Sequence, residues 1–253
     1  MTVSLPMYDR PETREANAAF WRAIRSDLAI RAPGLDALPD RLRVPTDAMA
    51  HWRDPALIFS QTCGLPFRKY LHPQVVLCGT PDFGLPGCPP GHYNSVLVMR
   101  RDDPRGPDDW PVMTLALNGF DSQSGWAAPF AHAQARGVHF CTHHVTGAHR
   151  ASARAVLDGA ADIAALDAQT WRMMRRWDDW TAGLREAEHT EPTPGLPYIT
   201  AAGRHSGHRP DPAAAFAALA PEHRATLDLR GIVALSAERY TALPLPPEPA
   251  ESD

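Results

Sequence analysis

One stretch says most about the fold: Asn118-Gly119-Phe120-Asp121-Ser122-Gln123-Ser124-Gly125. A strand-like run, 112–117, precedes it, and a helix-like run from Trp126 to Arg136 follows it. The first N–H groups of a helix have no partner within that helix, and they lie at the positive end of its dipole. A turn of this kind, with added serine hydroxyls, favours a small anion such as a phosphate, phosphonate or carboxylate.

Two other turns share this chemical character. Ser60-Gln61-Thr62-Cys63-Gly64 follows an apolar run, and Thr146-Gly147-Ala148-His149-Arg150 precedes an alanine-rich helix. Each turn alone is also explained by simple helix capping, for which Ser, Thr and Asp are ordinary residues. The repetition, together with a glycine close to each cap that permits close backbone approach, favours a ligand site.

The order of elements predicts an α/β fold. Strand-like and helix-like runs alternate, which indicates βαβ units and mostly parallel sheets whose ligands bind at the carboxyl ends of the strands. One helix is expected over 169–188. Proline-broken connections near 90–105 and 190–198 divide the chain. The predicted division is a first lobe of residues 1–95 and 196–243, a second lobe of 96–195, and a disordered tail of 244–253.

Composition excludes several classes of protein. The chain has 253 residues, 44% of them hydrophobic, and a net charge of -4 without any basic stripe, so we expect no nucleic-acid partner. No apolar run approaches the roughly 20 residues that span a bilayer. The N-terminus lacks the basic region of a secretory signal, and its apolar stretch ends at Pro6. This predicts either a cytoplasmic protein or a leader upstream of the sequence.

A set of motifs in order resembles a known family, the phosphate/phosphonate-type substrate-binding proteins of ABC transporters. The resemblance covers the chain from about Leu5 to Thr200. The motifs that carry it are Leu57–Gly64, Gly87-Cys88, Tyr93-Asn94-Ser95, Asn118-x-x-x-Ser122-Gln-Ser-Gly125, Thr146-Gly147-x-His149-x-x-Ser152, Gly159-x-x-Asp162-Ile-Ala-x-x-Asp167 and Pro194-Gly195-Leu196-Pro197. It implies the type II periplasmic-binding fold, in which two lobes close over a ligand about a two-strand hinge.

The resemblance also implies a function. A solute-binding protein of this kind captures a small anion, such as phosphate, phosphonate or a similar compound, in an interlobe cleft for ABC-type uptake. It implies a periplasmic monomer that works with an ABC permease, uses no cofactor and performs no chemistry. The alternative is a cytoplasmic enzyme or sensor on the same fold, similar to those of menaquinone and thiamine-pyrimidine pathways.

Carried over position by position, the resemblance implies a set of binding residues. The anion's oxygens would meet the serine hydroxyls and N–H groups of the 122–125 turn, and His149 would add a charge-assisted donor. Asp167 would meet a positively charged part of the ligand. The full set is Tyr8, Ser60, Thr62, Tyr93, Ser122, Gln123, Ser124, Gly125, Thr146, His149 and Asp167. One departure is Ala148, where the family has a serine, so one hydroxyl donor is missing.

Other candidate residues receive weaker roles. His139, Cys141 and His143 alternate as a metal site can, but without a carboxylate we expect them only to share a strand face. The four cysteines form no CxxC pair. The resemblance implies a pairing of Cys63 with Cys88 in an exported protein. Catalysis by Cys63 is not expected, because the sequence offers no dedicated base.

Overall fold

The computed structural model describes residues 1–33 and 38–248. It packs into two compact units, the first made of residues 1–91 and 194–243 and the second of residues 92–193 with 244–248. The last part of the predicted tail, residues 249–253, lies outside the described residues. We describe each unit separately.

Unit 1 is built on a five-stranded sheet in the order β1-β2-β11-β3-β12. β1 runs parallel to β2, whereas β11 runs antiparallel to both of its neighbours, β2 and β3. The strands are β1 (Thr2–Val3), β2 (Leu57–Gln61), β3 (Val75–Asp82), β11 (Tyr198–Ala201) and β12 (Gly231–Val233). The helices are α1 (Arg14–Arg31), α2 (Ala48–Trp52), α3 (Gly64–Pro66), α7 (Pro212–Ala218), α8 (Pro221–Thr226) and α9 (Ala237–Thr241), with shorter helical turns η1 (Phe67–Leu71) and η5 (Ser206–His208).

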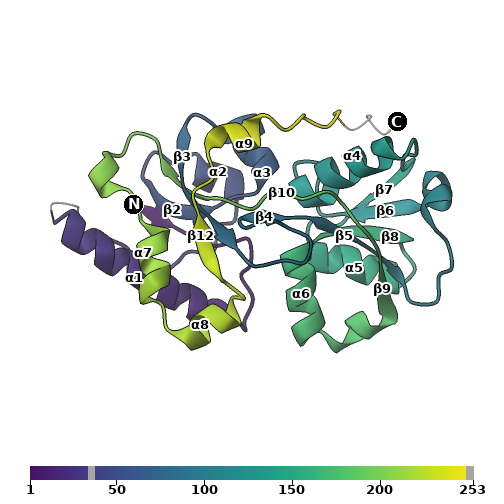
Figure 1. Ribbon diagram of the computed structural model, residues 1–253, viewed down its shortest axis with the longest axis horizontal. Helices are drawn as coiled ribbons and strands as arrows, with labels where there is room; N and C mark the ends of the chain where they lie inside the picture. The colour runs from purple at the N-terminus through teal and green to yellow at the C-terminus, as the bar shows by residue number, and fades with distance from the viewer. Residues whose placement is uncertain (34–37, 249–253) are drawn as a thin grey trace. The chain divides into compact units, whose positions relative to one another are not determined.

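Helices cover both faces of this sheet, with α1, α7 and α8 on one side and α2 and α9 on the other (Figure 1). Successive residues of β11 serve the two sides because strand side chains alternate. Tyr198 packs against Phe20 of α1, with ring centroids 5.6 Å apart. Ile199 belongs to the opposite core, which Trp52 of α2 and Tyr240 of α9 complete. The sheet is therefore buried on both faces.

Unit 2 contains a second five-stranded sheet, in the order β7-β6-β8-β5-β9. β6 runs parallel to β7 and β8, and β5 runs antiparallel to β8 and β9. The strands are β5 (Ser95–Arg100), β6 (Thr114–Leu117), β7 (Thr142–Val145), β8 (Ile163–Asp167) and β9 (Leu184–His189). The helices are α4 (Ala128–Ala135), α5 (His149–Leu157) and α6 (Ala168–Trp177), with the turns η2 (Pro107–Val112), η3 (Gln123–Ala127) and η4 (Asp179–Gly183). A two-stranded sheet pairs β4 (His92–Tyr93) with β10 (Thr193–Pro194).

The core of unit 2 follows the same alternation. Leu115 and Leu117 of β6 and Leu97 of β5 belong to one buried cluster with Trp126 and Ala133, which lies under α4. Figure 1 shows α5 and α6 on the other side of the sheet. The α/β class predicted from the sequence is confirmed. The sheets are mixed rather than mostly parallel, because β5 and β11 run against their neighbours.

The prediction of one helix over 169–188 is wrong for the second half of that range. α6 ends at Trp177, because Asp178 adopts an extended conformation with φ −116° and ψ 92°. The chain then makes the short turn η4 and forms β9, which pairs with β5 from Leu184 to His189. The residues of β9 favour helix, but the pairing with a buried strand decides their conformation.

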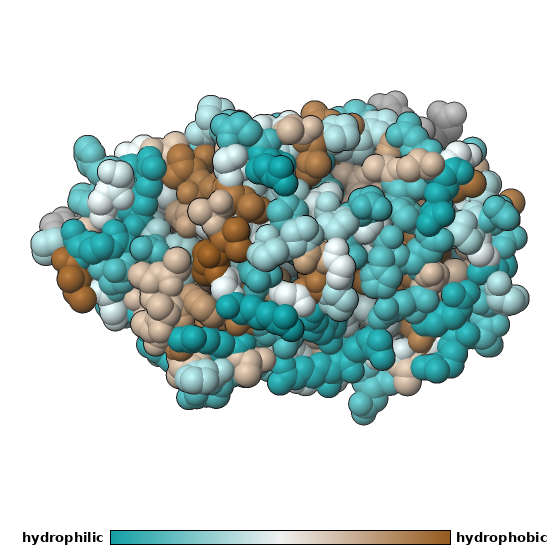
Figure 2. Space-filling view, viewed as in Figure 1, coloured by the Kyte–Doolittle hydropathy of each residue, from teal (hydrophilic) through white to brown (hydrophobic). Residues whose placement is uncertain are grey.

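The surface is mainly hydrophilic on the face that Figure 2 shows, with hydrophobic residues in smaller groups. The most exposed large hydrophobic side chains are Ile30, Val44 and Val112. Exposed apolar residues of this kind are common on proteins and need no functional explanation. Within residues 1–33 and 38–248, no helix has both the length and the apolar character needed to cross a membrane.

Candidate functional site

The turn after β6 in unit 2 forms the entry to a helix, as the sequence predicts. Ser122 is the N-cap of η3, and its Oγ accepts the N–H of Gly125 at 2.9 Å. The Ser122 carbonyl accepts the N–H groups of Trp126 and Ala127, each at 3.1 Å. The N–H groups of Gln123 and Ser124 come before the first residue whose N–H can bond to a carbonyl within the helix. They lie at the positive end of the helix dipole, where an anion is stabilised.

This geometry corrects one expected contact. The N–H group of Gly125 was assigned to the anion, but the structure uses it to bind Ser122 Oγ. Because Ser122 Oγ acts there as the acceptor, the Ser122 hydroxyl keeps its own proton for donation. Within the turn, the Gly125 N–H is thus bonded to Ser122 Oγ.

His149 lies beside this turn. It is the first residue of α5, and its Nε2 lies 3.0 Å from Ser124 Oγ. Residues that are separated in the sequence by the helix α4, the strand β7 and their loops thus come together in one unit. The predicted grouping of Ser122, Ser124 and His149 is a real juxtaposition in the structure.

The protonation state of His149 differs from the expectation of a charged donor. The residue is partly exposed as a whole, but its Nδ1 is buried and has no hydrogen-bond partner of normal geometry. Burial lowers the pKa of His149 to about 4 and outweighs a hydrogen bond with the backbone carbonyl of Ala165, which acts in the opposite direction. His149 is therefore a neutral imidazole at pH 7. A bound anion would raise this pKa, because a nearby negative charge favours the protonated form.

A glycine is required at position 125 because a neighbouring side chain lies too close for a Cβ atom. A Cβ atom at this position would overlap Asn118 Oδ1 and would lie 3.2 Å from Ser122 Oγ. The Asn118 side chain thus fills the space in which a side chain at 125 would lie. This contact explains why a glycine stands at the third position of the helical turn.

We predict that Gly125→Ala lowers the free energy of unfolding by about 1–3 kcal/mol, because an added methyl group overpacks the turn. Removing the obstructing amide in the double variant Asn118→Ala/Gly125→Ala should recover part of this loss. Gly207→Ala is a matched control, because a Cβ there would meet nothing within 4 Å. Urea denaturation measures all three. Equal losses in the single and double variants would contradict the proposed overlap.

Two hydroxyls, of the buried Ser95 and the half-buried Thr146, fasten the helix-entry turns of unit 2. Ser95, at the start of β5, donates to the Ser124 carbonyl at 2.8 Å. Thr146 Oγ1 lies 3.1 Å from the Leu117 carbonyl at the end of β6 and 2.7 Å from Ser152 Oγ. The Thr146 hydroxyl is thus occupied in joining the third turn to β6. Its predicted ligand role stays a prediction, whereas its structural role is directly visible.

Asp167 also has a structural role. It is the N-cap of α6, and its Oδ1 accepts the N–H of Thr170 at 2.8 Å. The residue is 2% exposed. Tyr93, on β4, is buried to the same degree. The structure does not test the predicted contacts of either side chain with a ligand.

The remaining predicted residues belong to unit 1. Ser60 is in β2 and Thr62 follows it, and both are fully buried. The Thr62 N–H donates to the Pro197 carbonyl at 3.1 Å. Tyr8 packs edge-on against Phe83, with ring centroids 5.2 Å apart. These residues end β2 or follow β1, at the strand ends where the sequence analysis expected them.

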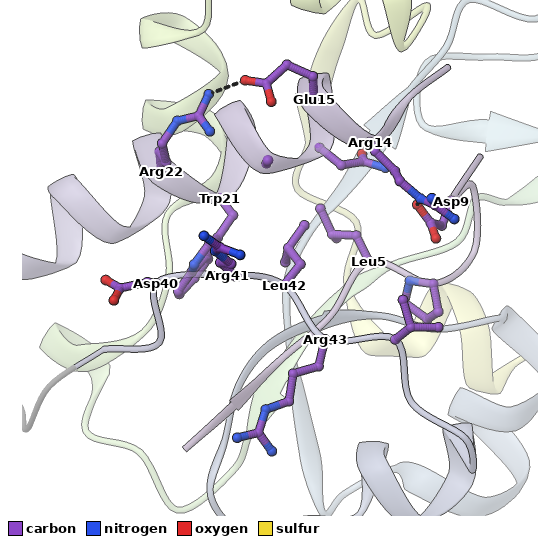
Figure 3. A pocket seen from close by; sticks show the side chains of 14 residues that line it. Leu5, Asp9, Arg14, Glu15, Trp21, Arg22, Asp40, Arg41, Leu42 and Arg43 are labelled. Atoms are coloured by element: carbon purple, nitrogen blue, oxygen red, sulfur yellow. Dashed lines mark hydrogen bonds and ion pairs between the residues drawn. The ribbon is translucent and has the colours of Figure 1, made fainter. Parts of the chain in front are cut away.

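A large cavity in unit 1 contains none of the predicted binding residues. It has a volume of about 650 Å³ and lies between α1 and residues 40–44 (Figure 3). Its three carboxylates are each paired with an arginine: Asp9 with Arg14, Glu15 with Arg22, and Asp40 with Arg25. Figure 3 shows Arg43 pointing away from the other lining side chains.

The prediction that His139, Cys141 and His143 share one strand face is wrong. β7 begins at Thr142, so His139 and Cys141 lie outside the strand. His143 packs edge-on against Phe120 and Trp126 instead, and burial lowers its pKa. Among residues 1–33 and 38–248, no group of His, Cys, Asp and Glu side chains has the arrangement of a metal site.

The implied pairing of Cys63 with Cys88 is not present. All four cysteines belong to the described residues, and no disulfide joins any of them. Cys63 is buried as the N-cap residue of the short helix α3.

Several residues that shape the site had no assigned role in the sequence analysis. Ser95 and Ser152 lie within the motifs that carried the family resemblance, and these motifs could have pointed to their roles. Asn118 also stood in the quoted turn. Ser4, which contacts both His51 and Ser60, had no signal, because these partners lie 47 and 56 positions away in the sequence.

The comparison with protein families decides the assignment. The family described as "ABC transporter, phosphonate, periplasmic substrate-binding protein" matches residues 83–240, more than half of the chain. The chain belongs to this family. As a phosphonate-type substrate-binding protein, it has the solute-binding role that the sequence predicts. Among curated proteins, none matches the sequence.

Solved structures show the same fold. PhnD1 from Prochlorococcus marinus (MIT 9301), in complex with methylphosphonate, is 14% identical, with a TM-score of 0.72 over 96% of this chain and 94% of that one. A binding protein component of an ABC phosphonate transporter from Pseudomonas aeruginosa is 12% identical, with a TM-score of 0.69 over 95% and 82%. XAC2383 from Xanthomonas citri, bound to ATP, is 15% identical, with a TM-score of 0.67 over 96% and 94%. The predicted periplasmic-binding fold of this substrate-binding protein is confirmed.

Proposed function

We propose that this substrate-binding protein captures a small phosphonate or phosphate-like anion for ABC-type uptake and releases it chemically unchanged. The observation that carries the proposal is the helix-entry turn of unit 2, where Ser122 Oγ caps the turn and the Ser124 hydroxyl lies 3.0 Å from His149 Nε2. The complex of PhnD1 with methylphosphonate supports this ligand class. The working partner would be the permease of an ABC transporter, as for other members of the family.

The proposed donors are mainly neutral. The binding set contains no lysine or arginine, and His149 is uncharged at pH 7 before a ligand binds. Binding energy would come from hydroxyl and N–H donors at a helix entry, each hydrogen bond to a charged group contributing about 1.5–3 kcal/mol.

The same geometry argues against catalysis. Ser124 and His149 resemble a nucleophile and its base, since their side chains lie 3.0 Å apart. A working base of this kind is held by a third group at its other nitrogen and has a pKa near the operating pH. The pKa of His149 is about 4, far below neutral pH. The pair therefore suits binding better than proton abstraction.

The test is calorimetric titration with methylphosphonate. We expect a dissociation constant at or below about 1 µM, equivalent to roughly 8 kcal/mol. Dimethyl methylphosphonate is the matched control, because it has the same phosphonyl core without the negative charge, and it should not bind. After incubation, ³¹P NMR should show methylphosphonate unchanged. Equal binding of both compounds would reject the anion site, and turnover of the ligand would reject the non-catalytic role.

A further inference from the structure

The cavity of unit 1 lies between α1 and a chain segment that is anchored on two sides. Trp21 Nε1 of α1 donates to the Pro39 carbonyl at 2.9 Å, and the Arg43 N–H donates to the Val3 carbonyl at 2.9 Å. The cavity volume of about 650 Å³ falls within the range of roughly 300–1,000 Å³ that small-molecule sites occupy. The cavity is therefore formed in advance and large enough for a small molecule.

The lining of this cavity is mainly apolar. Trp21 and Leu5 are buried, with 1% and 6% of their surfaces exposed. Figure 3 shows the Leu5 and Leu42 side chains in the space between α1 and the 40–44 segment. Pro6, Ala18 and Val44 complete the apolar part of the lining. An apolar group that enters the cavity is stabilised, because water is removed from both surfaces.

One buried polar side chain of the lining has no partner in the protein. Asn17 of α1 is 7% exposed and lines the cavity. Its backbone N–H donates to the Thr13 carbonyl, but its side-chain amide forms no hydrogen bond with the described residues. Buried polar side chains are normally hydrogen-bonded, and an asparagine amide both donates and accepts. The Asn17 amide is therefore available to an amide or hydroxyl group of an occupant.

The charges of the lining leave one cation for a ligand. The three carboxylates are already paired with arginines, as described above. Arg41 also lines the cavity, and within residues 1–33 and 38–248 it forms no ion pair. Arg43 points away from the other lining side chains (Figure 3). A guanidinium in this position favours a carboxylate, which it can bind with two parallel hydrogen bonds.

We propose that this cavity is a second binding site, for a small amphipathic carboxylate that also carries an amide or hydroxyl group. The apolar part of the ligand would lie against Leu5 and Trp21, the amide or hydroxyl would bind Asn17, and the carboxylate would bind Arg41. This site goes beyond the proposed capture of a phosphonate. It lies entirely within unit 1, so the inference does not depend on the anion turn of unit 2.

The test is calorimetric titration with N-octanoylglycine, which has an apolar chain, an amide and a carboxylate. We expect a dissociation constant below about 100 µM. N-octanoylglycinamide is the neutral control, and undecanoate has the same chain length without the amide. Arg41→Gln should reduce the preference for N-octanoylglycine over its glycinamide about tenfold, and Asn17→Ala should reduce the preference over undecanoate about fivefold.

The matched control is Arg43→Gln, which removes the same charge from a side chain that points away from the cavity. It should leave both preferences unchanged, and urea denaturation shows whether each variant is folded. The NMR signal of Trp21 Nε1–H, assigned with Trp21→Phe, should shift during the titration with N-octanoylglycine. The proposal is wrong if N-octanoylglycine does not bind, if it binds without moving this signal, or if both preferences survive in Arg41→Gln and Asn17→Ala.

Discussion

Replacing both Ser122 and Ser124 by alanine should weaken methylphosphonate binding at least a hundredfold. Each hydrogen bond from a hydroxyl to a charged ligand contributes about 1.5–3 kcal/mol, so two lost donors remove about 3–6 kcal/mol. Ser122→Ala also removes the N-cap bond to Gly125, which stabilises the helix entry by about 1 kcal/mol. Calorimetric titration measures the affinity, and urea denaturation shows how much of the change comes from the fold.

The control for this experiment is Ser206→Ala, which removes an exposed hydroxyl in η5 of unit 1. It should leave the affinity unchanged. Ser122→Thr keeps both the cap and the hydroxyl, and it should retain most of the binding. If the double alanine variant binds methylphosphonate as tightly as the wild type, the anion site lies elsewhere.

Acidification should destabilise the ligand-free protein through His149. Its pKa is about 4 in the folded state and 6.5 when unperturbed, so between these values the unfolded chain binds the proton and the folded protein does not. The free energy of unfolding should therefore fall as the pH falls from 6.5 to 4. At 1.36 kcal/mol per pH unit, the loss approaches about 3 kcal/mol as an upper limit.

The measurement is urea denaturation at pH 7 and at pH 4.5 for the wild type and for His149→Gln. Glutamine stays neutral at both values, so the variant should lose much less stability on acidification. His205→Gln, which replaces an exposed histidine of unit 1, is the matched control variant. Saturating methylphosphonate should reduce the wild-type loss, since the anion raises the pKa of His149. Identical losses in wild type and His149→Gln would show that His149 is not the group responsible.

Local sequence patterns predicted the elements that local interactions determine. The turn at 122–125 has its cap serine, its glycine and the following helix in one short stretch, and the structure contains each of them. α1, which spans Arg14–Arg31, has Phe20, Ile24 and Leu28 at the i, i+4 spacing of a helix stripe, and this stripe is buried.

Features that depend on contacts between residues far apart in the sequence were not predicted. The residues of β9 favour a helix, and only the pairing with β5 makes them a strand. The antiparallel direction of β11 follows from where the chain re-enters unit 1, which no local pattern records. The neutral state of His149 results from burial by the folded unit, so a single sequence could place the histidine but not its charge. The contact of Ser4 with His51 and Ser60 belongs to the same category.

The place of β11 in its sheet has a consequence for synthesis on the ribosome. β2 and β3 are not neighbours, because β11 is inserted between them, and its residues 198–201 are made more than a hundred residues later. Unit 1 therefore starts first but cannot close its sheet until β11, and finally β12, has emerged. The sheet of unit 2 is complete once β9 ends at His189. The second unit thus finishes folding first, and the N-terminal segment waits with unpaired strand edges, the state in which a nascent chain most needs a chaperone.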